Sequence, residues 1–218
     1  MAAALQDLLS AEKALIFRVT HVENLPWILA HGVWCRSANK VDPNFISIGN
    51  IELIEMRARR QVPIPPGGTL SDYVPFYFTP RSPMLLNITT GWGGIRQRAR
   101  EDVVFLVSSL HRLSELGRRF VYSDRHAYLA AATNSSDVEE LASLVSFELL
   151  RAGDFRRDPE APDRAERYQA EALVHQHLPC DALSGIACYT EAVKARIETL
   201  VAEKGIALPV RVRREWYL

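Results

Sequence analysis

The segment VPIPPGGTLSDYVPFYFTPRSPM, residues 62–84, contains the pattern that decides the fold of this chain. Its Pro/Gly-rich start predicts a rigid turn, because proline fixes one backbone dihedral and glycine adopts conformations closed to other residues. The aromatic run 73–79 predicts a buried strand despite Pro75, which a sheet tolerates only at edges and irregularities. A second turn carries Arg81. Since binding residues concentrate on loops held by a rigid scaffold, we expect a ligand to contact this unit.

The rest of the chain combines short strand patterns with a few helical ones. Apolar and β-branched runs predict strands at residues 14–21, 103–108, 120–123, 171–175, 185–189 and 208–214, the last at a sheet edge. Periodicity predicts helices at 23–31, 51–60 and 191–203, and residues 1–13 are expected to form a short helix or an arm. A capping-box match at Ser136 predicts a helix through Leu144. Segregated strands and helices are typical of the α+β class, so we expect one α+β domain over residues 1–218.

Residues 151–167, RAGDFRRDPEAPDRAER, are polar, charged and interrupted by proline. This composition predicts a long loop. Loops of this length inside a compact domain are usually functional or disordered.

The composition is that of an ordinary globular protein, with 48% hydrophobic and 24% charged residues. No apolar run reaches the length of a membrane span, and the start MAAALQDLLSAEK lacks the basic and apolar regions of a signal peptide. These features predict a cytoplasmic protein without membrane association. The cysteines Cys35, Cys180 and Cys188 show no CxxC spacing, so we expect reduced thiols and no metal site.

The type of positive charge is more informative than the net charge, which is zero. The chain has 22 arginines and 4 lysines, and the planar arginine side chain suits phosphates and flat rings. The arginines cluster at residues 57–60, 96–100, 156–157 and 211–214. Clustering favours an anionic partner such as a polynucleotide or a pyrophosphate, although a GC-rich coding sequence also explains an arginine excess.

Simple catalytic motifs are absent from the sequence: there is no P-loop, GxGxxG, HExxH or GxSxG pattern. The glycine-rich run 91–94 lacks the strand-to-helix context of a phosphate cradle and is more typical of a mobile loop. Taken by itself, Glu171 is typical of a surface glutamate.

Five blocks of sequence together resemble the DarT family, the DNA ADP-ribosyltransferase toxins of bacterial toxin–antitoxin pairs. The blocks are VTHVENLPWIL (19–29), SIGN with the following Arg-rich helix (47–60), residues 62–84, VYSDRHA (121–127) and YQAEALVH (168–175). The resemblance implies an ADP-ribosyltransferase-like fold, in which a split, curved β-sheet core with flanking helices holds NAD+. It also implies transfer of ADP-ribose to a base in single-stranded DNA, with thymidine as the expected acceptor and a macrodomain antitoxin as partner.

The resemblance also implies two catalytic residues. Glu171 matches the catalytic glutamate of the family, and a carboxylate near the ribose stabilises the positive charge that develops as NAD+ is cleaved. Arg57 matches a helix arginine that acts at the acceptor base and borders the NAD+ site, where a cation stabilises a deprotonated base nitrogen.

Further residues match ligand-contacting positions of the family. Thr20 matches an NAD+-contacting residue, Arg18 stands where some relatives have histidine, and Tyr77 and Met84 match residues around the nicotinamide. His126 matches a histidine on the DNA side, where a neutral imidazole can relay a proton. The segment 151–167 corresponds to the loop that selects the acceptor, and there Arg156 and Arg157 are expected to contact phosphates.

Other functions stay open at this point. A protein-directed ADP-ribosyltransferase or an NAD+ glycohydrolase would use the same donor site. A non-catalytic nucleic-acid-binding module would keep the fold without turnover, although it would have no need of Glu171. A monomer is expected.

Overall fold

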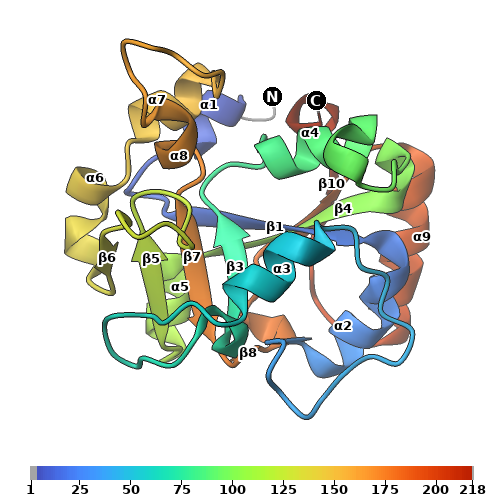
Figure 1. The fold of residues 1–218 in the computed structure, drawn as a ribbon. Coiled ribbons are helices and arrows are strands. Elements are labelled where there is room, and N and C mark those ends of the chain that lie inside the picture. The colour runs from blue at the N-terminus through green and yellow to red at the C-terminus, as the bar shows by residue number, and fades with distance from the viewer. Residues whose placement is uncertain (1–3, 218) are drawn as a thin grey trace.

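The computed structural model describes residues 4–217, and its main feature is a large mixed β-sheet covered by helices (Figure 1). The strands of this sheet are β1 (Leu15–His21), β3 (Tyr73–Tyr77), β4 (Val103–Ser109), β5 (Phe120–Ser123), β6 (Asn134–Ser135), β7 (Glu171–His175), β9 (Gly185–Cys188) and β10 (Val210–Val212). Their order is β10-β9-β4-β1-β3-β7-β5-β6. Neighbours run antiparallel except β9 and β10, which are parallel. Strands β2 (Val33–Trp34) and β8 (His177–Leu178) form a separate ladder.

Helices surround the sheet, and α3 crosses in front of it near β1 and β3 (Figure 1). The helices are α1 (Leu5–Leu8), α2 (Leu25–His31), α3 (Ile51–Arg57), α4 (Pro83–Thr90), α5 (Leu110–Glu115), α6 (Leu141–Leu144), α7 (Phe147–Ala152), α8 (Arg164–Arg167) and α9 (Glu191–Glu203). No helix within residues 4–217 combines the length and the apolarity needed to cross a membrane.

The sheet is split between β1 and β3. All seven residues of β1 are in register with β4, whereas β1 and β3 share the single pair Phe17–Tyr77. Pro75 faces this gap, because its carbonyl accepts a hydrogen bond from the Arg18 guanidinium of β1 at 2.9 Å. Proline has no N–H that the gap would leave unpaired, which explains why the strand accommodates it.

The two faces of β3 and β7 pack against different cores. Successive side chains of a strand point to opposite faces. Val74, Phe76, Ala172 and Val174 belong to the main core of the protein. The alternate residues belong to a smaller core, which consists of Val62, Leu70, Tyr73, Val121, Ala127 and Leu173. Glu171 and Tyr77 are in phase with this second set and therefore lie on the face that α3 covers.

The predicted strands at 14–21, 73–79, 103–108 and 171–175 are confirmed, with ends that differ by up to two residues. The strand predicted at the edge is also confirmed, since β10 is the last strand on its side of the sheet. Of the predicted N-terminal helix or arm, α1 is confirmed, and residues 1–3 lie outside the described residues.

Three local predictions are wrong in part. The helix predicted at 51–60 ends at Arg57, because the N–H groups of Arg59 and Arg60 donate to carbonyls three residues back rather than four. The Arg60 carbonyl then accepts from the Leu70 N–H at 2.9 Å. The cap predicted at Ser136 is formed by Asp137, whose carboxylate accepts from the Glu139 N–H at 3.0 Å. The loop predicted at 151–167 contains the end of α7 and all of α8, which the ion pair between Arg164 and Asp158 at 2.8 Å helps to order.

Candidate active site

The two predicted catalytic residues, Glu171 and Arg57, meet as a buried ion pair. Glu171 is the first residue of β7 and lies opposite Tyr77 of β3 and Ser123 of β5. Arg57 is the last residue of α3, and its two terminal nitrogens donate to the two carboxylate oxygens at 2.7 and 2.6 Å. The side chains are 1% exposed for Glu171 and 13% for Arg57. This bidentate geometry fixes the orientation of both planar groups.

Burial disfavours charge on both partners, but their mutual attraction outweighs it. Burial raises the pKa of Glu171, whereas Arg57, His126 and the Ala127 N–H lower it, and the net pKa lies below its usual value. Burial likewise lowers the pKa of Arg57, whereas the charge and hydrogen bonds of Glu171 raise it above its usual value. Both side chains are therefore charged at neutral pH.

The turn after β5 completes the surroundings of the carboxylate. The Ala127 N–H donates to Glu171 Oε1 at 3.2 Å. His126 Nδ1 lies 3.6 Å from the same oxygen, and His126 Nε2 lies 3.4 Å from Arg57 Nη1. Burial, opposed by Glu171 and assisted by Arg57, lowers the pKa of His126, so its imidazole is neutral at pH 7.

The carboxylate keeps capacity for one more donor. Oε1 accepts from Arg57 and from the Ala127 N–H, which uses both of its lone pairs. Among the described residues, Oε2 accepts from Arg57 alone. A hydroxyl can therefore bind Oε2 without breaking the ion pair.

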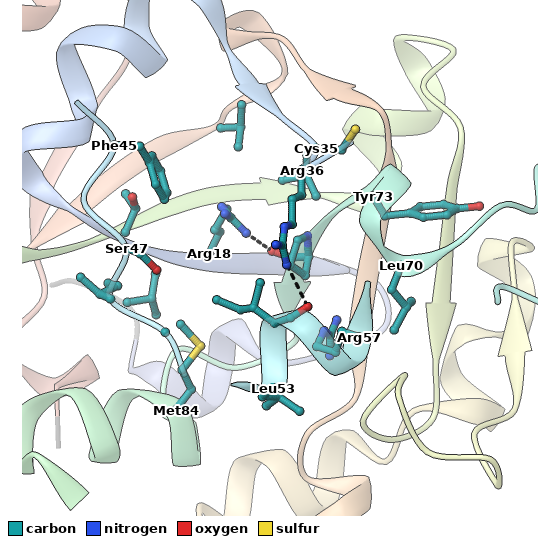
Figure 2. Close-up of a pocket in the computed structure, with 18 of the residues that line it drawn as sticks. Arg18, Cys35, Arg36, Phe45, Ser47, Leu53, Arg57, Leu70, Tyr73 and Met84 are labelled. Carbon is teal, nitrogen blue, oxygen red and sulfur yellow. Dashed lines mark hydrogen bonds between the residues drawn. The ribbon is translucent and has the colours of Figure 1, made fainter. Parts of the chain in front are cut away.

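The predicted cofactor residues line a cavity of about 540 Å³ over the split in the sheet. Figure 2 shows Arg18 at the back of this cavity, with Met84 on one side and Arg57 on the other. Burial lowers the pKa of Arg18 to about 10, which leaves it cationic at neutral pH. The Tyr77 hydroxyl lies 3.9 Å from the Met84 sulfur, and burial followed by the charge of Glu171 raises the pKa of Tyr77. The cavity thus combines fixed positive charge with a neutral phenol and a thioether.

Sequence reasoning missed Asn24, which joins β1 to the segment 36–50. Its side-chain N–H groups donate to Thr20 Oγ1 at 3.1 Å and to the Ile46 carbonyl at 3.0 Å. Its side-chain oxygen accepts from the Ile46 N–H at 2.8 Å. Asn24 is 1% exposed, and a buried amide with all these partners fixes a loop as a backbone pairing would. A polar residue within the VENLPWIL block was the available signal.

The segment 36–50 supplies further cavity residues, among them Arg36, Phe45 and Ser47 (Figure 2), of which only Ser47 lies in one of the five family blocks. Arg36 donates to the Ile54 carbonyl of α3 at 3.2 Å and forms an ion pair with Glu55. Phe45 is 48% exposed. The aromatic Phe45, next to the SIGN block, was the available signal for this wall.

A family model described as "ssDNA thymidine ADP-ribosyltransferase, DarT" matches residues 17–218. The chain belongs to the DarT family. It is 46% identical over 209 residues to a DNA ADP-ribosyl transferase of Escherichia coli O127:H6, which covers 96% of this chain and 95% of the relative. Its fold is similar to that of Thermus sp. 2.9 DarT in complex with ADP-ribosylated ssDNA, with a TM-score of 0.86, 36% identity and coverage of 95% and 97% of the two chains. The structure of the same Thermus protein in complex with NAD+ matches with a TM-score of 0.81, 34% identity and coverage of 94% and 98%.

These matches confirm three predictions from the sequence: the DarT family, the α+β ADP-ribosyltransferase fold and the class of DNA ADP-ribosyltransferase enzymes. The family resemblance implied a split β-sheet core. In this chain the split lies between β1 and β3, and the cavity opens over it.

Of the three predicted DNA-contacting residues, only His126 lies beside the Arg57–Glu171 ion pair. His126 lies beside it, as described above. Arg156 is 86% exposed and binds Asp154 at 2.9 Å, and neither Arg156 nor Arg157 lines the cavity. A contact of these two arginines with DNA stays a prediction, and it would lie outside the cavity.

Proposed function

We propose that this DarT protein cleaves NAD+ and transfers ADP-ribose to thymidine in single-stranded DNA, with Glu171 and Arg57 as its catalytic residues. The observation that carries the proposal is the bidentate Arg57–Glu171 pair at 2.7 and 2.6 Å beside a cavity of about 540 Å³. The pair places one anion and one cation at a single point of the cleft. Transfer of a sugar to a base needs both charges there.

The cavity fits the chemistry of NAD+. Arg18 and Arg36 provide positive charge for a pyrophosphate, and Ser47 and Asn50 provide polar groups for hydroxyls and amides. Tyr77 and Phe45 offer ring faces to the flat parts of the molecule. Thr20 also lines the cavity, and its hydroxyl accepts a hydrogen bond from the Asn24 side chain.

Glu171 stabilises the donor half of the reaction. Positive charge develops on the nicotinamide ribose as its bond to nicotinamide breaks, and a fixed carboxylate stabilises that charge. Oε2 has the lone pair to accept a ribose hydroxyl, which would orient the sugar. Arg57 and the Ala127 N–H hold the carboxylate in place, so little reorganisation accompanies the step.

Arg57 and His126 act on the acceptor. A nitrogen of thymine forms the new bond to the ribose carbon and loses its proton, while nicotinamide leaves with the bonding electrons. Arg57 stabilises negative charge on the base, and its terminal nitrogen lies 3.4 Å from His126 Nε2. The lowered pKa of His126 makes the imidazole neutral and able to accept a proton.

Single-stranded DNA suits such a site, because a base outside a duplex enters the cleft at low cost. Arginine and aromatic side chains hold single strands by phosphate contacts and stacking, without a basic overall charge. In this proposal, the segment 151–167 selects the acceptor, and Arg156 and Arg157 contact phosphates there.

The family resemblance supports further proposals about the cellular role. We propose a cytoplasmic toxin that is opposed by a macrodomain antitoxin and acts as a monomer. We also propose that residues 1–218 fold as one domain.

Intact mass of single-stranded oligonucleotides after incubation with the protein and NAD+ tests the function. The expected result is an ADP-ribose increment on strands that contain thymidine, absent with Glu171→Ala. An increment confined to guanosine-containing strands would keep the mechanism and replace the acceptor. Consumption of NAD+ without a DNA adduct would redirect the proposal to protein acceptors or to hydrolysis, and NAD+-independent DNA binding without turnover would indicate a binding module.

A further inference from the structure

The turn that holds His126 is tied to the segment 151–167 by one arginine that the mechanism above does not use. Arg125 is 17% exposed and donates from Nε to Asp124 Oδ2 at 3.0 Å. Its terminal nitrogens lie 3.5 Å from Oε2 of Glu166, within α8, and 3.9 Å from Oδ2 of Asp163, the residue before α8. One guanidinium thus bridges the end of β5 and the segment before Glu171.

Backbone contacts make the same connection. The His126 N–H donates to the Glu166 carbonyl at 3.1 Å, and the next N–H, that of Ala127, donates to Glu171 Oε1 at 3.2 Å. Asp124 is itself fixed, because Oδ1 accepts from the Thr133 N–H at 2.9 Å. The turn 124–127 is therefore hydrogen-bonded both to α8 and to the catalytic carboxylate.

Arg125 does not touch the donor side of the site. It does not line the cavity over the split in the sheet. Within residues 4–217, its side chain pairs with the carboxylates of Asp124, Asp163 and Glu166. A change at Arg125 should therefore act on the position of the acceptor segment and leave the NAD+ cavity intact.

We propose that Arg125 is a positioning residue that holds the segment 151–167 in register with His126 and Glu171, so that a DNA strand bound by the segment presents its base to the ribose carbon. This inference rests on the proposed function and names a residue through which acceptor binding is coupled to catalysis. The terminal guanidinium nitrogens of Arg125 lie within ion-pair distance of Glu166 and Asp163, at 3.5 and 3.9 Å. Lysine has a single charged nitrogen and cannot contact the same three carboxylates at once.

The test compares Arg125→Ala, Arg125→Lys and Glu166→Gln with the parent protein. We expect Arg125→Ala to bind NAD+ as the parent does and to lose about 10- to 100-fold in kcat/KM for the oligonucleotide, the size of effect that a misplacement near 1 Å produces. The kcat/KM of Arg125→Lys should lie between those of the parent and of Arg125→Ala. Because Arg125 acts through Glu166, the double variant Arg125→Ala/Glu166→Gln should be no slower than Arg125→Ala alone.

Arg196→Ala is the matched control, because Arg196 lies on α9, outside the cavity lining, and its removal breaks an exposed ion pair with Glu23. Hydrogen exchange supplies a structural readout. The amides of His126 and Ala127 should exchange faster in Arg125→Ala than in the parent, and at the parental rate in Arg196→Ala.

Equal loss of NAD+ binding and DNA modification in Arg125→Ala would overturn the positioning role. Additive effects in the double variant, or parental rates in Arg125→Ala, would also overturn it. If the parent itself modifies no oligonucleotide, the proposed function fails, whereas the exchange measurement still decides whether Arg125 orders the turn.

Discussion

Removal of the Glu171 carboxylate should destabilise the folded protein as well as inactivate it. Glu171→Ala leaves the Arg57 guanidinium without its counterion in a site where that side chain is 13% exposed. It also removes the acceptor of three hydrogen bonds, two from Arg57 and one from the Ala127 N–H. The charge of Arg57 persists, so its burial cost is no longer offset.

The size of the effect follows from these contacts. Breaking a buried pair by removal of one partner costs about 3–5 kcal/mol. Because Arg57 borders a cavity that admits water, we expect the lower end, about 3 kcal/mol. In a protein of this size, 1 kcal/mol shifts the melting temperature by about 2–4 °C, so the variant should melt about 6–12 °C below the parent.

Thermal and denaturant unfolding at pH 7 measure this difference, and Arg57→Met/Glu171→Ala serves as the comparison. Loss of both charges leaves no unpaired ion, so the double variant should recover at least half of the lost stability. The pH dependence has a definite sign. The folded pKa of Glu171 lies below its usual 4.5, so the stabilisation is complete above that pH and is lost as the pH falls through the folded pKa.

Two results would refute this reasoning. One is a Glu171→Ala variant that melts within 2 °C of the parent or above it, since about 2 °C corresponds to less than 1 kcal/mol. The other is a double variant that is less stable than either single variant. Either result would mean that an unpaired Arg57 guanidinium does not carry the burial cost assigned to it here.

Three further predictions concern the walls of the cavity. Asn24→Ala should cost about 1–3 kcal/mol, because it leaves the Ile46 backbone groups unpaired, and KM for NAD+ should rise in initial-rate assays; an unchanged KM would contradict the anchoring role. Gly32→Ala should lower the melting temperature, because the residue has φ +75° and an added Cβ would clash with the His177 ring, and a variant as stable as the parent would exclude that clash. Arg57→Lys keeps the charge but not the two-point contact, so kcat for oligonucleotide modification should fall about 10- to 100-fold, and parental turnover would show that charge alone suffices.

Much of the fold was accessible from local patterns. The alternation in residues 171–175 and the apolar run 103–108 predict strands because side-chain direction in a strand has a period of two residues. Errors arose where a contact distant in sequence overrode the local signal. The helix predicted to residue 60 stops at Arg57, and just beyond it the Arg60 carbonyl accepts from the N–H of Leu70, a contact that no local pattern indicates.

The candidate site divides in the same way. The family blocks in the sequence indicate Glu171, Arg57 and His126 individually, and each of them lies at the ion pair. The roles of residues 36–46 and of Asn24 were missed, because the burial of a polar side chain depends on what packs over it. The role of Arg125 was equally hidden, since its carboxylate partners on α8 lie outside its own sequence block.

By itself, the sequence determined the family, the strand and helix types and the identity of the charged residues. Only the tertiary structure decided that Arg57 and Glu171, which are 114 residues apart, neutralise each other at 2.6 Å. The physical reason is that periodicity and capping are local properties of the chain. Strand register and the place where the sheet splits depend instead on which distant segments pair. The pKa of a buried carboxylate depends on which distant segments exclude water from that carboxylate.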